Sequence, residues 1–198
     1  MTYSIIGSGN IGSAVARQFA RKDLDVAIAN RRGPDSLAPL CKELGQHVIP
    51  QTLEAALRAG IVILAVPFSV VERLAHAEGD WTGRIVIDAT NAISFPAFTP
   101  IDLGGRPSSE VVAEKLRGAR LVKAFNTLPA AVLAADPIEA GRHRVLFISG
   151  NDAEANSVVA SLAAKFGFAP IVLGKLAAGG LLQQFGGPLM AQNLVKLE

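Results

Sequence analysis

The chain has 198 residues, which is enough for one sizeable hydrophobic core but short of two average domains. Half of the residues are hydrophobic, 18% are charged and the net charge is +2, which excludes a disordered polyelectrolyte and lacks the basic surplus of a nucleic-acid-binding protein. The single cysteine, Cys41, excludes an internal disulfide framework and a cysteine-rich zinc site, and no metal site is expected.

Predicted strands and helices alternate along nearly the whole chain. Short apolar runs predict buried strands, and apolar residues spaced three or four positions apart predict helices. Strands are expected at residues 3–6, 25–29, 46–49, 61–66, 84–88, 120–125, 144–149 and 169–173. One helix is expected to begin near residue 11, and a second, after the strand at 25–29, is expected to end near residue 44. Further helices are expected at residues 53–59, 69–77, 109–116, 128–135 and 151–166, and in the tail from residue 176, with a break at 186–188. Residues 91–107 are expected to be mostly loop.

Three polar residues are predicted to cap helices with their side chains. Ser69 with Glu72, and Asn151 with Glu154, have the spacing of a capping box. Ser108 stands immediately before another predicted helix. The alternation of elements predicts an α/β, Rossmann-type doubly wound fold with a mostly parallel sheet and a short C-terminal extension. Short strands at the far edge of the sheet are left open to antiparallel pairing.

A glycine-rich turn follows the first predicted strand and opens the next helix. Its sequence, Gly7-Ser8-Gly9-Asn10-Ile11-Gly12, has the G-x-G-x-x-G spacing of dinucleotide-binding proteins. Gly7 permits the tight turn, Gly9 lets the backbone approach a pyrophosphate, and Gly12 lets the helix pack closely on the strand. The N-terminus of the helix offers free N–H groups to the phosphates. The alternative is a plain turn between a strand and a helix.

The end of the second predicted strand indicates which dinucleotide is bound. An NAD site has Asp or Glu about 20 residues after the glycines, to bind the ribose 2′-hydroxyl. This chain has Asn30-Arg31-Arg32 there, and two guanidinium groups can grip a 2′-phosphate. The predicted cofactor is therefore NADP(H) rather than NAD(H). The alternative is that both arginines merely solvate the end of a strand.

Three further strand ends are expected to border the ligand crevice, because ligands bind outside the carboxyl ends of parallel strands. For each polar side chain there, helix capping or turn formation is an equal alternative. The residues expected to contact the cofactor at these ends are Ala65, Val66, Pro67, Ala89, Asn91, Ala124 and Asn126.

No side chain stands out as a catalytic acid or base, and the catalytic residues are unknown. The one tyrosine, Tyr3, lies inside a predicted strand, so the chain lacks the Tyr and Lys pair of a short-chain dehydrogenase. A nicotinamide cofactor and its acceptor can carry out hydride transfer while the protein supplies position and electrostatics. This favours a flavin-like acceptor over a carbonyl, which needs a proton donor.

These motifs resemble the coenzyme F420-dependent NADP oxidoreductases. The resemblance rests on the glycine turn, on Asn30-Arg31-Arg32, and on later segments that end near Leu189: residues 65–67, 88–91, 123–127, 149–152, 179–180 and 186–189. It implies hydride transfer between NADP(H) and the deazaflavin coenzyme F420, and commonly a homodimer. It also implies that residues 8–11 bind the pyrophosphate and residues 30–32 the 2′-phosphate. The substrate is implied to lie over the nicotinamide, between Asn91 to Ile93 and Leu189.

The expected protein is thus one NADP(H)-binding Rossmann-like domain over residues 1–198, in which residues 151–198 complete the sheet and cover the substrate. The expected activity is hydride transfer between NADPH and F420 or a flavin-like acceptor. Two alternatives stay open: an NADPH-dependent reductase of a small imine, quinone or carbonyl, and a non-catalytic NADP(H) sensor.

The expected partner molecules are a small-molecule electron acceptor and a second copy of the chain, with no nucleic acid and no membrane. The mostly apolar segment 176–197 suggests a buried partner surface; the alternative is that it packs on its own sheet. A cytoplasmic location is expected, because the N-terminal residues do not resemble a signal peptide and the longest apolar stretch is short for a membrane span.

Overall fold

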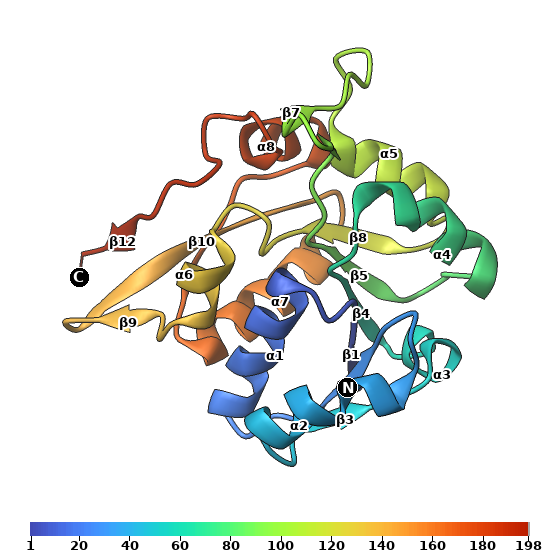
Figure 1. The fold of residues 1–198 in the computed structure, drawn as a ribbon. Coiled ribbons are helices and arrows are strands. Elements are labelled where there is room, and N and C mark those ends of the chain that lie inside the picture. Colours follow the sequence, from blue (N-terminus) through green and yellow to red (C-terminus); the bar gives the residue numbers. More distant parts are fainter. Residues whose placement is uncertain (198) are drawn as a thin grey trace.

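A twisted, mostly parallel sheet runs through the middle of the molecule (Figure 1). The structure is a computed structural model and describes residues 1–197. The parallel strands are β1 Tyr3–Ile6, β2 Val26–Ala29, β3 Val48–Pro50, β4 Ile61–Leu64, β5 Ile85–Asp88 and β8 Arg120–Lys123. Their order is β3-β2-β1-β4-β5-β8. The chain first adds strands on one side of β1 and then on the other, so the order of strands switches at β1 as in a Rossmann fold.

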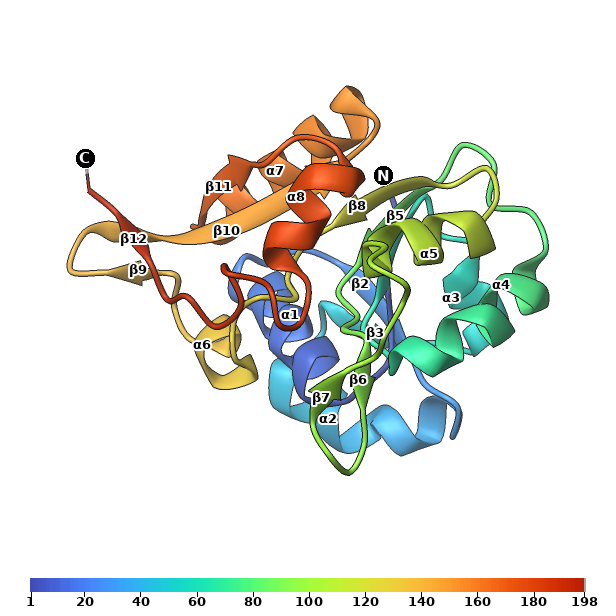
Figure 2. The same cartoon turned by 90° about the horizontal axis from the view of Figure 1, so that it is seen from above.

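The far edge of the sheet departs from this parallel order. The nine-residue strand β10, Arg142–Gly150, pairs antiparallel with β8, and β11, Ala169–Val172, pairs parallel with β10. Two short strands, β9 Ile138–Glu139 and β12 Val195–Lys196, pair antiparallel with β10. The remaining strands, β6 Ile93–Ser94 and β7 Thr99–Pro100, form a separate hairpin (Figure 2).

Helices cover both faces of the sheet, and the sheet separates two main apolar cores. On one face pack α1 Asn10–Arg21, α2 Ala38–Leu44, α6 Ala130–Ala134 and α7 Ala153–Phe166. On the other pack α3 Leu53–Leu57, α4 Val71–Glu78, α5 Ser108–Lys115 and α8 Leu176–Gln183. Short 3-10 helices span Pro34–Leu37 and Phe68–Val70.

The central strands are mostly apolar because both of their faces are buried, and β4 is apolar throughout. In β4, Ile63 points into the first core and Val62 and Leu64 into the second, since successive side chains of a strand alternate. The predicted α/β, Rossmann-type doubly wound fold with a C-terminal extension is confirmed. Each predicted strand is present, with ends that differ by a few residues.

The three predicted side-chain caps are wrong. Ser69 lies inside the 3-10 helix that precedes α4, and the N-cap residue of α4 is Val70, not Ser69. Ser108 is the first residue of α5, and its buried hydroxyl has no hydrogen-bond partner among the described residues. The cap of α7 is Asp152, whose side chain accepts from Ala155 N–H, because the register of the helix begins one residue later than predicted.

The side chain of Asn151 serves the C-terminal extension instead. Its Oδ1 accepts a hydrogen bond of 3.0 Å from the backbone N–H of Leu176, the first residue of α8. Asn151 therefore joins the loop after β10 to the start of a helix 25 residues later. Local sequence spacing cannot show such a partner, because the two residues are adjacent only in the folded chain.

The tail was expected to remain helical beyond its glycine break, and this is also wrong. After α8 the chain runs along β10, where Val145 N–H donates to Leu194 C=O at 2.9 Å and β12 forms. The buried guanidinium of Arg144 holds the tail by donating to the side chains of Asn193 and Glu139. The long β10 extends past β8 and offers free backbone groups, which the tail and β9 satisfy.

The apolar segment 176–197 is divided between the protein's own core and the surface. Leu176 is buried, and Leu189 packs against Val145 and Phe147 of β10. Exposed apolar side chains of the segment are Leu181, Leu182, Leu194, Val195 and Leu197. Both alternatives given for this segment keep support, and a homodimer stays a prediction.

An ion pair joins β8 to the start of α7. Arg120 donates to both carboxylate oxygens of Asp152, at 2.9 and 2.8 Å, and also to Glu154. This guanidinium and the N–H of Ala155 lower the pKa of Asp152 from 3.8 to about 2.

Acid should therefore weaken the fold through Asp152. Because the folded-state pKa lies below that of the unfolded chain, the carboxylate stabilises the fold above pH 3.8, and this contribution is lost as pH falls toward about 2. We expect the urea midpoint of the wild type to fall more between pH 5 and pH 2.5 than that of Asp152→Asn. Parallel pH profiles for the two proteins would contradict this role.

Among residues 1–197, no helix has both the length and the apolar character needed to cross a membrane.

Candidate cofactor site

The carboxyl ends of the parallel strands bring the predicted site residues together along one edge of the sheet. Each loop is joined to the neighbouring strand by a backbone hydrogen bond. The N–H groups of Gly7, Ala65, Ala89 and Ala124 donate to the carbonyls of Ala29, Ile6, Leu64 and Asp88, at 2.8, 2.9, 3.1 and 3.3 Å. Four loops far apart in the sequence thus line up in the crevice where Rossmann folds bind dinucleotides.

Two glycines of the turn are required by close backbone packing. Gly7 has a φ of +112°, and a Cβ there would lie 2.2 Å from the carbonyl oxygen of Ala65. A Cβ on Gly12 would lie 1.9 Å from the carbonyl oxygen of Gly7, so α1 passes directly over the turn. At Gly9 a Cβ would meet no atom within 4 Å, which leaves open space beside the N-terminus of α1.

The N-terminus of α1 is suited to an anion. Its N-cap is Gly9, with no side-chain cap, and its first turn, at Asn10 and Ile11, holds no acidic residue. The first-turn N–H groups of a helix lack intrahelical partners and carry partial positive charge. This donor set, with open space in front of it, fits a pyrophosphate.

Asn30 joins the end of β2 to the glycine turn. Its Nδ2 donates to the hydroxyl of Ser8 at 2.9 Å and to that of Ser36 at 3.0 Å. Its Oδ1 accepts from the backbone N–H of Arg32 at 2.8 Å. Both Arg31 and Arg32 are exposed, and neither forms an ion pair with any residue from 1 to 197. The hydrogen bonds of Asn30 thus hold the backbone at Arg32 beside the turn, and the two exposed guanidinium groups that follow Asn30 fit a 2′-phosphate.

The segment after β4 forms the wall opposite the turn. Ala65 packs under Gly7 and Gly12, and Val66 Cγ1 lies 3.2 Å from the position of a Cβ on Gly7. Pro67 is exposed and begins the 3-10 helix before α4. These residues border the crevice with small or apolar surfaces and no charge.

A buried ion pair crosses the next two strands, and the sequence reasoning missed it. Asp88 ends β5, Lys123 ends β8, and the two residues are directly opposite in the sheet. Lys123 Nζ lies 2.9 Å from Asp88 Oδ2 and donates to Thr90 C=O at 2.5 Å, with both charged side chains fully buried. The signal was present, because Asp88 directly follows the apolar residues of β5 and Lys123, of opposite charge, directly follows Leu121 and Val122 of β8.

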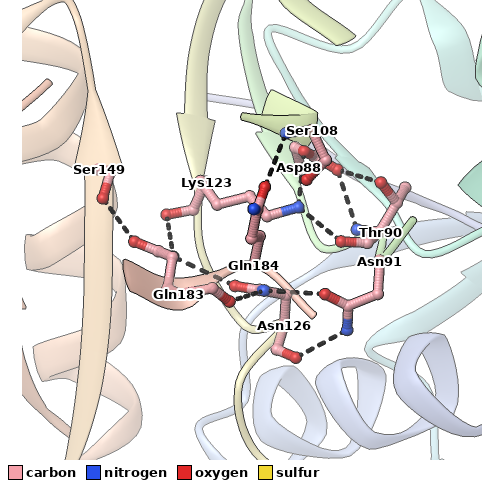
Figure 3. Close-up of polar contacts among 9 residues, drawn as sticks. All are labelled: Asp88, Thr90, Asn91, Ser108, Lys123, Asn126, Ser149, Gln183 and Gln184. Carbon is pink, nitrogen blue, oxygen red and sulfur yellow. Dashed lines mark hydrogen bonds and ion pairs between the residues drawn. The ribbon is translucent and has the colours of Figure 1, made fainter. Parts of the chain in front are cut away.

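The ion pair holds the loop that follows β5. Asp88 Oδ1 accepts from both the backbone N–H and the hydroxyl of Thr90, at 2.9 and 2.6 Å. With Lys123 on the carbonyl of Thr90, every polar group of this residue is engaged. Figure 3 shows these contacts of Thr90 with Asp88 and Lys123, and they preorganise the backbone of the loop.

Asn91 and Asn126 face each other at the floor of the crevice. Asn126 Nδ2 donates to Asn91 Oδ1, and Asn91 Nδ2 donates to the carbonyl of Asn126, both at 3.0 Å. Asn126 is 1% exposed and is also bonded to Gln183 of α8, whereas Asn91 is half-buried. The sequence reasoning missed Gln183. Its only signal in the sequence is an amide side chain at the end of a largely apolar segment.

A cavity lies beside this floor, near the segments that hold the predicted substrate residues. The cavity, of about 470 Å³, lies between the loop after β5 and α8, and Ala92, Ile101, Arg106, Leu181 and Phe185 are among its lining residues. Ile93 follows Ala92 in β6, and Leu189 lies beyond α8, where its N–H donates to Leu182 C=O. None of the three predicted substrate residues, Asn91, Ile93 and Leu189, lines the cavity itself.

Metal-binding and thiol chemistry have little support in residues 1–197. No three His, Cys, Asp or Glu side chains gather there as metal ligands would. Cys41 is half-buried against the core beside α1, and burial raises the pKa of its thiol. A raised pKa disfavours the reactive thiolate.

Comparison with known proteins shows that the N-terminal part of the chain matches a known family. Residues 2–92 match the family model described as "NADP oxidoreductase coenzyme F420-dependent". A hypothetical protein from Sinorhizobium meliloti has a closely similar structure, with a TM-score of 0.96 and 54% identity, covering 99% of this chain and 96% of that chain. A candidate F420-dependent NADP reductase from Arthrobacter has a TM-score of 0.74 and 26% identity, covering 89% and 86% of the two chains.

A curated relative is much longer. Metalloreductase STEAP3 of Rattus norvegicus is 26% identical over 174 residues, which are 88% of this chain and 34% of the rat protein. The chain thus spans about a third of the length of that relative. The family match covers the glycine turn, Asn30-Arg31-Arg32, and residues 65–67 and 88–91. The later segments of the sequence resemblance, which are residues 123–127, 149–152, 179–180 and 186–189, lie outside the match. Residues 2–92, slightly less than half of the chain, are therefore similar to the coenzyme F420-dependent NADP oxidoreductase family.

Proposed function

We propose that the chain transfers a hydride between NADPH and a flavin-like acceptor, either coenzyme F420 or a flavin. The observation that carries the proposal is the hydrogen bond from Asn30 to Ser8, which sets Arg31 and Arg32 beside an uncapped helix N-terminus. Two adjacent anion sites of this kind suit the pyrophosphate and the 2′-phosphate of one NADP(H) molecule.

The chain's residues supply binding and orientation along the edge of the sheet. Residues 8–11 would hold the pyrophosphate and residues 30–32 the 2′-phosphate. Ala65, Val66 and Pro67 would border the middle of the cofactor, and Ala89, Asn91, Ala124 and Asn126 its nicotinamide half. Bound NADPH supplies the hydride from C4 of its nicotinamide.

The chemistry of the floor supports a flavin-like acceptor. The titratable side chains that end β5 and β8 are Asp88 and Lys123, which are buried and paired with each other. Neither is placed to deliver a proton to a carbonyl oxygen in the crevice. A flavin or deazaflavin ring accepts hydride and can take any proton from water, so it requires no acid from the chain.

The cavity beside Ala92 and Phe185 gives such a ring a place next to the nicotinamide. Its volume, about 470 Å³, lies in the range of ligand pockets, and its walls mix apolar side chains with Arg106 and Gln184. The proposed acceptor site uses Asn91 and Ile93 on one side and α8 with Leu189 on the other. The family name and the Arthrobacter reductase agree with an F420 acceptor.

An acceptor screen tests the function directly. We expect purified protein to oxidise NADPH in the presence of F420, FMN or FAD, measured as loss of NADPH absorbance, and to be slower with quinones, imines and small carbonyls. Turnover confined to an imine, quinone or carbonyl would contradict the flavin-like acceptor. Micromolar NADPH binding without turnover on any acceptor would favour a sensor.

A further inference from the structure

We infer that Gln183, the last residue of α8, is a positioning residue that fixes the nicotinamide end of the crevice through Asn126 and Asn91. The inference rests on the proposed function and adds to it a residue from the C-terminal extension, well beyond the end of the family match at residue 92. Gln183 touches none of the proposed phosphate-binding residues, so its effect is confined to one end of the cofactor.

Gln183 is the point where three parts of the chain meet. Its buried side chain donates from Nε2 to Lys123 C=O and to Asn126 Oδ1, both at 3.1 Å, and accepts at Oε1 from Ser149 Oγ at 2.5 Å. Its main-chain carbonyl accepts from Asn126 Nδ2 at 2.6 Å. Gln183 therefore joins α8 to β8, to β10 and to the loop after β8 (Figure 3).

Asn126 passes this constraint to Asn91. Both ends of the Asn126 amide are bonded to Gln183, and its Nδ2 also donates to Asn91 Oδ1. Such an arrangement allows one orientation of the amide, because reversing it would oppose donor to donor and acceptor to acceptor. Asn91 then keeps one amide hydrogen and one oxygen lone pair for a ligand above the floor.

The strand order places this network at the nicotinamide end. The proposed sites for the pyrophosphate and the 2′-phosphate are at the ends of β1 and β2, while Asn91 and Asn126 follow β5 and β8 on the other side of β1. A dinucleotide that lies along the edge with its phosphates at β1 and β2 reaches Asn91 with its nicotinamide half. Loosening Asn126 should therefore weaken binding of that half alone.

The experiment compares a whole cofactor with its adenosine part. Gln183→Met keeps the volume of the side chain and removes the side-chain hydrogen bonds to Asn126 Oδ1, Lys123 and Ser149, while the main-chain carbonyl of residue 183 can still accept from Asn126 Nδ2. By isothermal titration calorimetry, we expect its Kd for NADP+ to rise roughly tenfold, as the loss of one buried hydrogen-bond network predicts. The Kd for adenosine 2′,5′-bisphosphate, which lacks the nicotinamide half, should stay within about twofold of wild type.

Gln18→Met is the matched control, because Gln18 is a second buried glutamine, which donates to the backbone carbonyls of Leu133 and Ala135 and forms no hydrogen bond with Asn126 or Asn91. It should lower thermal stability and leave both Kd values unchanged. Equal loss of NADP+ affinity in Gln183→Met and Gln18→Met would overturn the inference, as would equal weakening of both ligands in Gln183→Met. If Gln183→Met does not fold by circular dichroism, the shorter Gln183→Asn takes its place, with the same expected selectivity.

The two proposals fail in different ways. Wild-type protein that binds neither ligand would overturn the proposed function, and this inference with it. Wild-type protein that binds both, with no selective loss in the Gln183 variants, would overturn the inference alone.

Discussion

Replacing Arg31 and Arg32 together by alanine is expected to raise the KM for NADPH by roughly 100-fold and to leave the KM for NADH within about threefold. Both guanidinium groups are exposed beside the glycine turn, so each is free to bind a 2′-phosphate. A charge-assisted hydrogen bond contributes about 1.5–3 kcal/mol, and the lower figure corresponds to roughly tenfold for each arginine. NADH has no 2′-phosphate and loses nothing.

Steady-state kinetics with both nucleotides measures the effect. Arg117→Ala is a suitable control. Arg117 is an exposed arginine that precedes the amino end of β8, whereas the site lies at the carboxyl ends of the strands. It removes one positive charge without touching the site. Equal rises in KM for NADPH and NADH in the double variant would show that the arginines do not read the 2′-phosphate.

Lys123→Met is expected to lower the free energy of unfolding by about 3–5 kcal/mol, because it leaves the carboxylate of Asp88 buried without its counter-ion. Both side chains are fully buried, so water cannot replace the lost partner. A loss of this size is a large fraction of the total stability of an ordinary domain. Urea unfolding followed by circular dichroism measures it.

The double variant Asp88→Asn/Lys123→Met separates the lost charge from lost packing. The introduced asparagine side chain is neutral, and its carbonyl oxygen can still accept the two hydrogen bonds that Thr90 gives to the residue at this position. We expect the double variant to regain at least about half of the loss, since removing both members of a buried pair is commonly near neutral. Equal stabilities of the single and double variants would show that the buried charge is not the cause.

Much of the dinucleotide fold was accessible from local patterns. β4 is continuously apolar, and β1 and β5 are interrupted only by Ser4 and Asp88, because both faces of these strands are buried; each apolar run marked its strand. The glycine turn was equally legible, because the close approach of α1 to Gly7 and of Gly7 to Ala65 leaves no room for side chains. Where packing demands one residue type, the sequence reveals it.

The far edge and the helix caps were less accessible. Whether Asn151 or Asp152 caps α7 depends on a shift of one residue, and Asn151 is bonded instead to the start of α8. The tail forms β12 because β10 extends past β8 and presents unpaired backbone groups. Such choices depend on which distant partner is available, and hydrophobic periodicity carries no information about that.

The same division runs through the site. Residue types alone pointed to a dinucleotide carrying a 2′-phosphate, because glycines in a turn and arginines after a strand each have a chemical use that depends on local spacing. The pairing of Asp88 with Lys123, and the bonds from Gln183 to Asn126, required the folded chain. Those residues lie 35 and 57 positions apart, and only the register of β5 with β8 and the packing of α8 bring their polar atoms within hydrogen-bonding distance.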